Sequence, residues 1–226
     1  MKRLVILGVV IIGLAITAIV HVNIKANKAD NQSVIDNQSI ANISTTTDQV
    51  NAKPIAHKAD LPLYAGQPIN FIGHDPIINQ YPKEVVEKQT KFLAEVAEFL
   101  KTHPGDFDSW VGVGIHKKFF NNFSGARDAW EYAKLLSPET VLPYLNLANL
   151  YAYYLNDFKK AELNYLAATT RDFNNIYGSY YATANFYRDF GFKDRAIEIY
   201  KKILELKPQD KVATVEIERL NNSTTQ

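Results

Sequence analysis

The chain has 226 residues, enough for one ordinary domain with additional segments, and 46% of them are hydrophobic, enough to form a packed core. Its formal net charge of +1 gives no overall electrostatic bias toward nucleic acid or acidic ligands. The chain has no cysteine, which excludes disulfides, thiolate metal sites and a cysteine nucleophile.

The first element in chain order is an apolar segment behind a short basic flank, residues 1–3. Residues 4–22 contain no Asp, Glu, Lys or Arg, and they approach the length of about 20 residues that spans a bilayer. No small-x-small cleavage site follows Val20, which favours an uncleaved transmembrane signal-anchor over a cleaved signal peptide. We therefore expect a single-pass membrane protein with a cytoplasmic amino terminus and an extracytoplasmic soluble part, although Lys25 and Lys28 weaken the charge bias.

Two segments without long helices are expected next. Residues 23–60 are rich in Asn, Gln, Ser and Thr and contain no aromatic residue, so they cannot bury enough apolar surface to fold and form a disordered linker. Residues 61–82 contain four prolines, which exclude a long helix. Their Leu, Ile, Tyr and Phe residues are too numerous for a free linker, and we expect an ordered extended segment that packs on the helical body.

From Lys83 to the end the pattern predicts helices, beginning with a flanking helix within 83–106. Three similar stretches follow, in which Ala126, Ala161 and Ala196 are spaced by 35 residues. An aromatic residue stands four residues after each alanine: Trp130, Tyr165 and Tyr200. A period of this length predicts a repeated helix hairpin.

These repeats resemble the tetratricopeptide repeat family, whose pattern places an aromatic at position 4, a small residue at 8, Tyr at 11, Ala at 20, an aromatic at 24 and Pro at 32. Residues 107–140, 141–176 and 177–208 form the three repeats. Their matching residues are Trp110, Gly114, Ala126, Trp130 and Pro138; Tyr144, Ala148, Tyr151, Ala161 and Tyr165; Tyr180, Ala184, Tyr187, Ala196, Tyr200 and Pro208. Lys117 replaces the usual tyrosine in the first repeat, and Phe173 stands where proline is usual in the second.

The resemblance covers about residues 107–222 and implies an all-α fold, a short α-solenoid of three helix hairpins with flanking helices. The small residues would let the two helices of each hairpin approach closely. Residues 209–226 are expected to form a C-terminal capping helix and a tail. We predict that Val212, Val215, Ile217 and Leu220 form the apolar face of this helix, and that Lys211, Glu216, Glu218 and Arg219 stay in solvent.

Catalytic motifs are not recognisable in the sequence, and we expect no enzyme, cofactor or metal site. Asp106 and Asp108 are interpreted as helix caps. His74 and Asp75, in "FIGHDP", are the one pair of interest, and a turn with a local hydrogen bond is the simpler interpretation. Basic and acidic residues balance from Lys83 onward, so nucleic acid is not an expected partner.

In this family the first helices of the hairpins line a concave groove. The resemblance implies that the partner-binding residues are Ile115, Phe119, Asn149, Tyr153, Tyr181, Asn185 and Arg188. Val111 and Ile115 stand where members that grip a terminal carboxylate carry a basic residue and Asn, so that subclass is rejected. The predicted function is a non-catalytic, membrane-anchored adaptor that binds an apolar peptide segment of a protein partner in a cell-envelope assembly. The alternatives are that residues 61–82 fill the groove, that the chain self-associates, or that it is an accessory subunit of an envelope enzyme whose site includes "FIGHDP".

Overall fold

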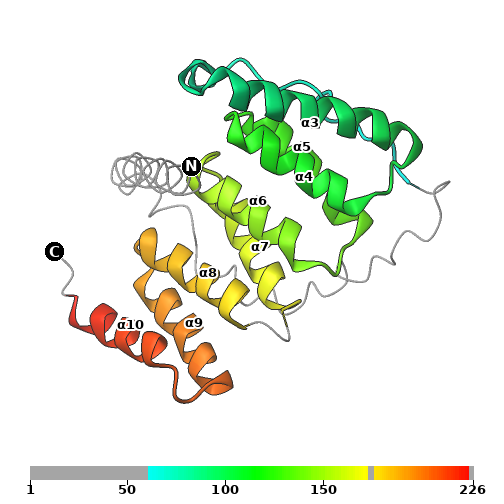
Figure 1. Ribbon diagram of the computed structural model, residues 1–226. Helices are drawn as coiled ribbons and strands as arrows, with labels where there is room; N and C mark the ends of the chain where they lie inside the picture. Colours follow the sequence, from blue (N-terminus) through cyan, green and yellow to red (C-terminus); the bar gives the residue numbers. More distant parts are fainter. Residues whose placement is uncertain (1–60, 173–175, 224–226) are drawn as a thin grey trace. The chain divides into compact units, whose positions relative to one another are not determined.

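The structure is a computed structural model that describes residues 61–172 and 176–223. The described residues form eight α-helices and a short 3-10 helix, with no strand among them, so this part of the chain is all-α as predicted. They divide into two units, one that ends before Ile176 and one that begins there, and each is described by itself (Figure 1). The predicted transmembrane segment 4–22 and the predicted linker 23–60 lie outside the described residues.

The amino-terminal unit contains η3 (Pro76–Gln80), α3 (Lys83–Thr102), α4 (Phe107–Phe119), α5 (Phe123–Leu136), α6 (Val141–Tyr153) and α7 (Phe158–Thr169). The carboxy-terminal unit contains α8 (Ile176–Asp189), α9 (Lys193–Leu206) and α10 (Lys211–Asn222). The pairs α4–α5, α6–α7 and α8–α9 each pack as a hairpin, while α3 packs on α4 and α10 on α9. The repeated helix hairpin predicted from the 35-residue period is confirmed. None of these helices combines the length and the apolar character needed to cross a membrane.

The turn inside each hairpin contains one residue with left-handed backbone. Asn121, Asn156 and Gly191 have φ values of 56°, 54° and 83°, and they are spaced by 35 residues. Asn and Gly adopt this conformation more readily than other residues. The same backbone turn therefore recurs once per hairpin, although the sequence encodes it with two residue types.

Four helices, α4, α5, α7 and α10, begin at a short polar side chain that caps them. Asp106, Asn122, Asp157 and Asp210 each accept a hydrogen bond from the backbone N–H three residues later, at 2.9 to 3.1 Å. This N-cap satisfies one of the free donors of the first turn. The predicted cap at Asp106 is confirmed, whereas Asp108 lies in the first turn of α4 and does not cap it.

Successive elements of the amino-terminal unit are joined by buried aromatic residues. Trp110 Nε1 donates to the carbonyl of Pro104 at 2.7 Å, and Tyr144 Oη donates to the carbonyl of Pro138 at 2.9 Å. Both donors lie six residues after the proline that they contact, near the start of the first helix of a hairpin. The turn between α3 and α4 is therefore closed by the same kind of bond as the turn between α5 and α6.

The predicted apolar face of α10 is confirmed at Leu220 and wrong at Val212 and Val215. Val212 and Val215 are 59% and 58% exposed, and the buried residues of the helix are Ala213 and Leu220. These two residues are seven positions apart and therefore lie on one helix face. Glu216, which was predicted to stay in solvent, lies beside Arg188 of α8, with 3.7 Å between Glu216 Oε2 and Arg188 Nη1. The small Ala213 allows close packing, which turns both valines outward.

Candidate partner-binding surfaces

The predicted groove residues on α4 differ in how far they are engaged. Ile115 is 52% exposed. Phe119 is partly buried, and its ring stacks on that of Tyr81, with 4.5 Å between the centroids. Tyr81 belongs to residues 61–82, which are called the strap from here on (the cyan trace that leads into α3 in Figure 1). The strap therefore covers Phe119 and leaves Ile115 half exposed.

The two predicted groove asparagines hold their own hairpins together. Asn149 Oδ1 accepts a hydrogen bond from Tyr165 Oη at 3.1 Å, and Asn149 Nδ2 donates to the Leu145 carbonyl at 2.9 Å. In the third hairpin, Asn185 Oδ1 accepts from Tyr200 Oη at 3.0 Å. The same Asn–Tyr pair thus links the two helices of both hairpins. These amide oxygens are engaged inside the fold, and the asparagines contribute to stability whether or not they contact a partner.

Tyr181 and Arg188 are engaged with the C-terminal cap. Tyr181 Oη donates to Asp210 Oδ1 at 2.5 Å, and Asp210 is the N-cap of α10. Arg188 Nε and Nη2 donate to Asp189 Oδ1 at 3.0 and 2.9 Å, and Arg188 Nη1 lies 3.7 Å from Glu216 Oε2. The two side chains therefore help to position α10 within the carboxy-terminal unit.

The seven predicted groove residues are distributed over both units. Ile115, Phe119, Asn149 and Tyr153 belong to the amino-terminal unit, and Tyr181, Asn185 and Arg188 belong to the carboxy-terminal unit. Tyr153 is partly buried at the end of α6. A single groove that unites all seven residues stays a prediction.

A second surface, which sequence analysis missed, holds the strap through the ammonium group of Lys117. The Lys117 side chain is fully buried, and its Nζ donates to the carbonyls of Pro68 and Phe71 at 2.8 and 2.9 Å. Asn122 Nδ2 also donates to the Phe71 carbonyl, at 3.2 Å. Burial lowers the pKa of Lys117 to about 8, and the nearby Asp128 carboxylate opposes this shift.

Helix α5 supplies the remaining polar contacts to the strap. Tyr132 Oη donates to the Pro62 carbonyl at 2.8 Å. Asp128 Oδ2 accepts from the Gln67 backbone N–H at 3.2 Å, and Ser124 Oγ accepts from Gln67 Nε2 at 2.7 Å. The residues that hold the strap on the α4–α5 hairpin are called the strap seat: Lys117, Asn122, Ser124, Asp128 and Tyr132.

An apolar contact completes this surface. The Tyr64 ring lies 4.4 Å from the Trp110 ring and 5.6 Å from the Tyr132 ring, measured between centroids. Leu93 and Leu100 of α3 belong to the same core cluster as Trp110 and Tyr132. A hollow of about 290 Å³ remains among the strap, α3 and the hairpin. The signal that could have revealed the seat was Lys117 itself, a charged residue at a repeat position that is otherwise Tyr and faces inward.

The "FIGHDP" segment does not assemble a reactive pair. His74 is exposed, and its ring meets the Phe71 ring edge-on at a centroid distance of 5.0 Å. Asp75 Oδ1 accepts from the Ile77 backbone N–H at 2.8 Å and caps η3, which is the local turn that the sequence suggested. Throughout 61–172 and 176–223, no group of three or more His, Asp or Glu side chains is placed to hold a metal ion.

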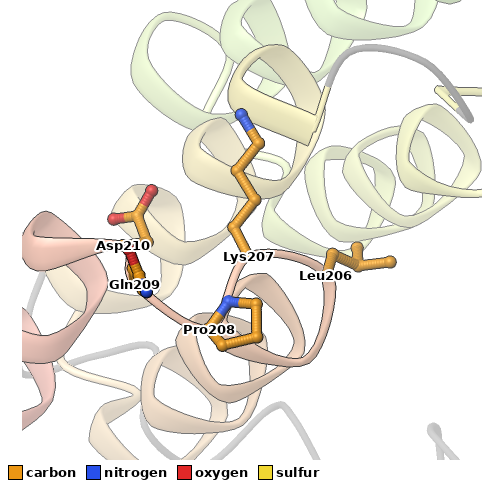
Figure 2. A pocket seen from close by; sticks show the side chains of 5 residues that line it. All are labelled: Leu206, Lys207, Pro208, Gln209 and Asp210. Atoms are coloured by element: carbon orange, nitrogen blue, oxygen red, sulfur yellow. The ribbon is translucent and has the colours of Figure 1, made fainter.

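A pocket at the α9–α10 connection is lined by Leu206, Lys207, Pro208, Gln209 and Asp210. Figure 2 shows the Lys207 side chain extended away from the connecting loop. The Asp210 carboxylate accepts from the Ala213 backbone N–H at 3.0 Å and from Tyr181 Oη. Because this carboxylate is engaged in capping α10, we assign the pocket no chemical role.

Comparison of the chain with protein-family models, curated proteins and solved structures gives no match.

Proposed function

We propose that this chain is a non-catalytic, membrane-anchored scaffold of the tetratricopeptide type, which binds a protein partner on the concave face of its helix hairpins in a cell-envelope assembly. The observation that carries the proposal is the recurrence of one hairpin, with the same left-handed turn at Asn121, Asn156 and Gly191. Repeated hairpins of this kind stack to bury their apolar faces, and their stacked first helices offer an extended binding surface.

The exposed side chains favour a partner with apolar anchors. Ile115 on α4 is half exposed, whereas the amide oxygens of Asn149 and Asn185 already accept hydrogen bonds from tyrosines of their own hairpins. A surface of this kind suits a peptide segment that inserts hydrophobic side chains, rather than one that is read through free amides. Ile115 is therefore the residue through which the proposal can be tested with least damage to the fold.

The matched substitutions for this test are Ile115→Asp and Leu135→Asp in the full-length chain. Ile115 and Leu135 are 52% and 51% exposed, and they lie on the first and second helix of the same hairpin. Proteins bound to each variant would be cross-linked in native membranes, purified and identified by mass spectrometry. We expect one partner to be captured by the unsubstituted chain and by Leu135→Asp but lost with Ile115→Asp.

Equal capture by the two variants, or an equal loss of capture, would contradict binding on the α4 face. Circular dichroism of both variants provides the folding control.

The predicted transmembrane anchor is tested separately with Val10→Arg, a substitution within residues 4–22. A charged residue at the centre of a spanning helix costs roughly 2.5–3.5 kcal/mol of insertion free energy. We expect the unsubstituted chain to remain in the membrane pellet after alkaline extraction and the variant to appear in the soluble fraction. Extraction of the unsubstituted chain would contradict the predicted membrane anchor. It would not bear on the proposed partner-binding surface.

A further inference from the structure

Most hydrogen bonds between the strap and its seat involve main-chain atoms of the strap, and the Tyr64 ring and the Gln67 side chain add contacts of their own. Three of its carbonyls, those of Pro62, Pro68 and Phe71, accept hydrogen bonds from Tyr132, Lys117 and Asn122. Its Gln67 N–H is bound by the Asp128 carboxylate. All of these partners belong to the α4–α5 hairpin. The seat therefore recognises an extended, proline-containing segment independently of how that segment is connected to α3.

Two buried polar atoms of the strap make no hydrogen bond in the closed chain. Tyr64 Oη and Gln67 Oε1 are buried, and neither has a hydrogen-bond partner among the described residues. A buried polar atom without a partner costs about 1–3 kcal/mol. The two atoms without partners lower the free energy needed to lift the strap from its seat. The two hydrogen bonds from the buried Lys117 ammonium to the Pro68 and Phe71 carbonyls act in the opposite direction and favour a strap, from either chain, in the seat.

The connection between the seated part of the strap and α3 contains a natural hinge. Gly73, two residues after the last hydrogen bonds to the seat at Phe71, has a φ of 105°, in the region that only glycine adopts readily. Tyr81 and Pro82 are already extended, with ψ values of 148° and 140°. A change of backbone angles at Gly73 can redirect residues 61–72 while α3 keeps its contacts with α4.

We propose that the strap of one copy of this chain occupies the strap seat of a second copy, so that two chains associate by exchanging residues 61–72. The exchanged pair contains the same contacts as two closed chains, and domain exchange of this kind needs no new interface. The balance is set by concentration, because the closed form competes at the effective concentration of a short tether, in the millimolar range. The proposal does not depend on the adaptor function or on the anchor.

The test uses two full-length chains, each with one introduced thiol, which is unique because the chain has no cysteine. The donor chain carries Gln67→Cys, and the seat chain carries Ser124→Cys and a size tag. These positions are in contact in the closed chain, where Gln67 Nε2 lies 2.7 Å from Ser124 Oγ. The chains are mixed, exposed briefly to dilute urea, diluted and treated with a short bismaleimide. We expect a donor–seat product whose yield rises with protein concentration.

Two reference samples fix the scale of this yield. A chain with both substitutions should cross-link within itself, because the closed form places the two positions in contact. A donor chain mixed with Glu218→Cys, an exposed position on α10, measures random collision. A donor–seat yield several-fold above the collision control supports exchange. A yield equal to that control, or failure of the double variant to close on itself, would overturn the proposal.

Tyr64→Ala distinguishes exchange from a general change in folding, because its effect depends on the chain that carries it. In the seat chain it weakens the competing strap, so the donor–seat product should increase. In the donor chain it weakens the strap that must bind in trans, so the product should decrease. A change in the same direction in both chains would indicate a structural effect and overturn the exchange.

Discussion

The hairpins α4–α5 and α6–α7 are built alike, yet one of their buried positions carries a charged residue in the first hairpin and not in the second. Each begins with an aromatic residue bonded to a proline carbonyl, Trp110 to Pro104 and Tyr144 to Pro138. Each also turns through a left-handed asparagine. At repeat position 11, however, the first hairpin has Lys117 and the second has Tyr151.

The two residue types at this position match the different hydrogen-bond acceptors that each side chain contacts. Tyr151 Oη donates to Glu131 Oε1 on α5 at 3.3 Å. Lys117 faces the strap, where it meets two main-chain carbonyls. A tyrosine hydroxyl has one proton to donate, whereas an ammonium group has three. The repeat position thus has one role, to bind the element that packs before the hairpin, and the residue type matches the number of acceptors there.

The largest loss of stability is expected from a substitution at Gly114, where the second hairpin has Ala148. A Cβ on Gly114 would lie 2.2 Å from Nε1 of the buried Trp130, which donates to the Val111 carbonyl at 3.1 Å. Gly114→Ala must displace this indole, and overpacking of this severity costs about 3 kcal/mol. Chemical denaturation of the full chain measures the change in the free energy of unfolding.

The second hairpin suggests the rescue of this variant. At the equivalent repeat positions it has Ala148 and Tyr165, and both residues are buried. Adding Trp130→Tyr to Gly114→Ala should therefore recover most of the lost stability, since the smaller ring leaves room for the methyl group. A double variant that is less stable than Gly114→Ala alone would show that the two hairpins do not share this packing.

Replacing the buried Lys117 is expected to cause the next largest loss in the free energy of unfolding. Lys117→Met keeps an unbranched side chain that is one atom shorter than lysine, and it removes both hydrogen bonds to the strap. The loss is limited, because the Phe71 carbonyl keeps Asn122 and the Pro68 carbonyl keeps the Phe71 N–H at 3.1 Å. We expect a loss of about 2 kcal/mol in the free energy of unfolding.

Hydrogen exchange locates this loss. The amide of Gln67 should exchange faster in Lys117→Met, while amides in α6 and α7 keep their protection. Protection that falls equally in all helices would mean that Lys117 stabilises the whole unit rather than the strap.

The stability difference between these two chains should widen with pH. The pKa of Lys117 is lowered by burial from 10.5 to about 8, so the unfolded chain binds more protons between these values. The free energy of unfolding contributed by this group therefore rises as the pH increases from about 8 toward 10, by roughly 1 kcal/mol per pH unit. Urea denaturation at pH 7.5, 8.5 and 9.5 tests this against Lys117→Met. A constant difference would contradict the lowered pKa.

The sequence predicted the hairpins because their packing depends on side chains at fixed positions. Small residues such as Ala126 and aromatic residues such as Trp130 recur at the period of the repeat, since close helix packing requires them there. The buried face of α10 was predicted correctly at Leu220 but not at Val212 and Val215. Ala213 carries the contact, whereas a hydrophobicity pattern gives more weight to the two valines.

The strap seat could not be predicted for a different reason. It binds main-chain carbonyls, which every sequence has, so only the unusual Lys117 pointed to it. For the two predicted groove asparagines, the sequence pattern identified the position but not the role of the side chain. Asn149 and Asn185 recur at one repeat position, but a recurring amide does not reveal whether its oxygen faces a partner or a tyrosine of its own hairpin.

The smallest loss of stability is expected at Tyr151, which occupies the same repeat position as Lys117. Tyr151→Phe removes the hydroxyl that bonds Glu131, but Glu131 keeps Lys134, with 2.8 Å between Glu131 Oε2 and Lys134 Nζ. The Glu131 side chain is also 38% exposed to solvent. No acceptor is left buried and unpaired, so the free energy of unfolding should fall by only about 0.5 kcal/mol. Denaturation of Tyr151→Phe beside Lys117→Met at pH 7 measures both. A loss at Tyr151 as large as that at Lys117 would mean that acceptor number does not explain the difference between the hairpins.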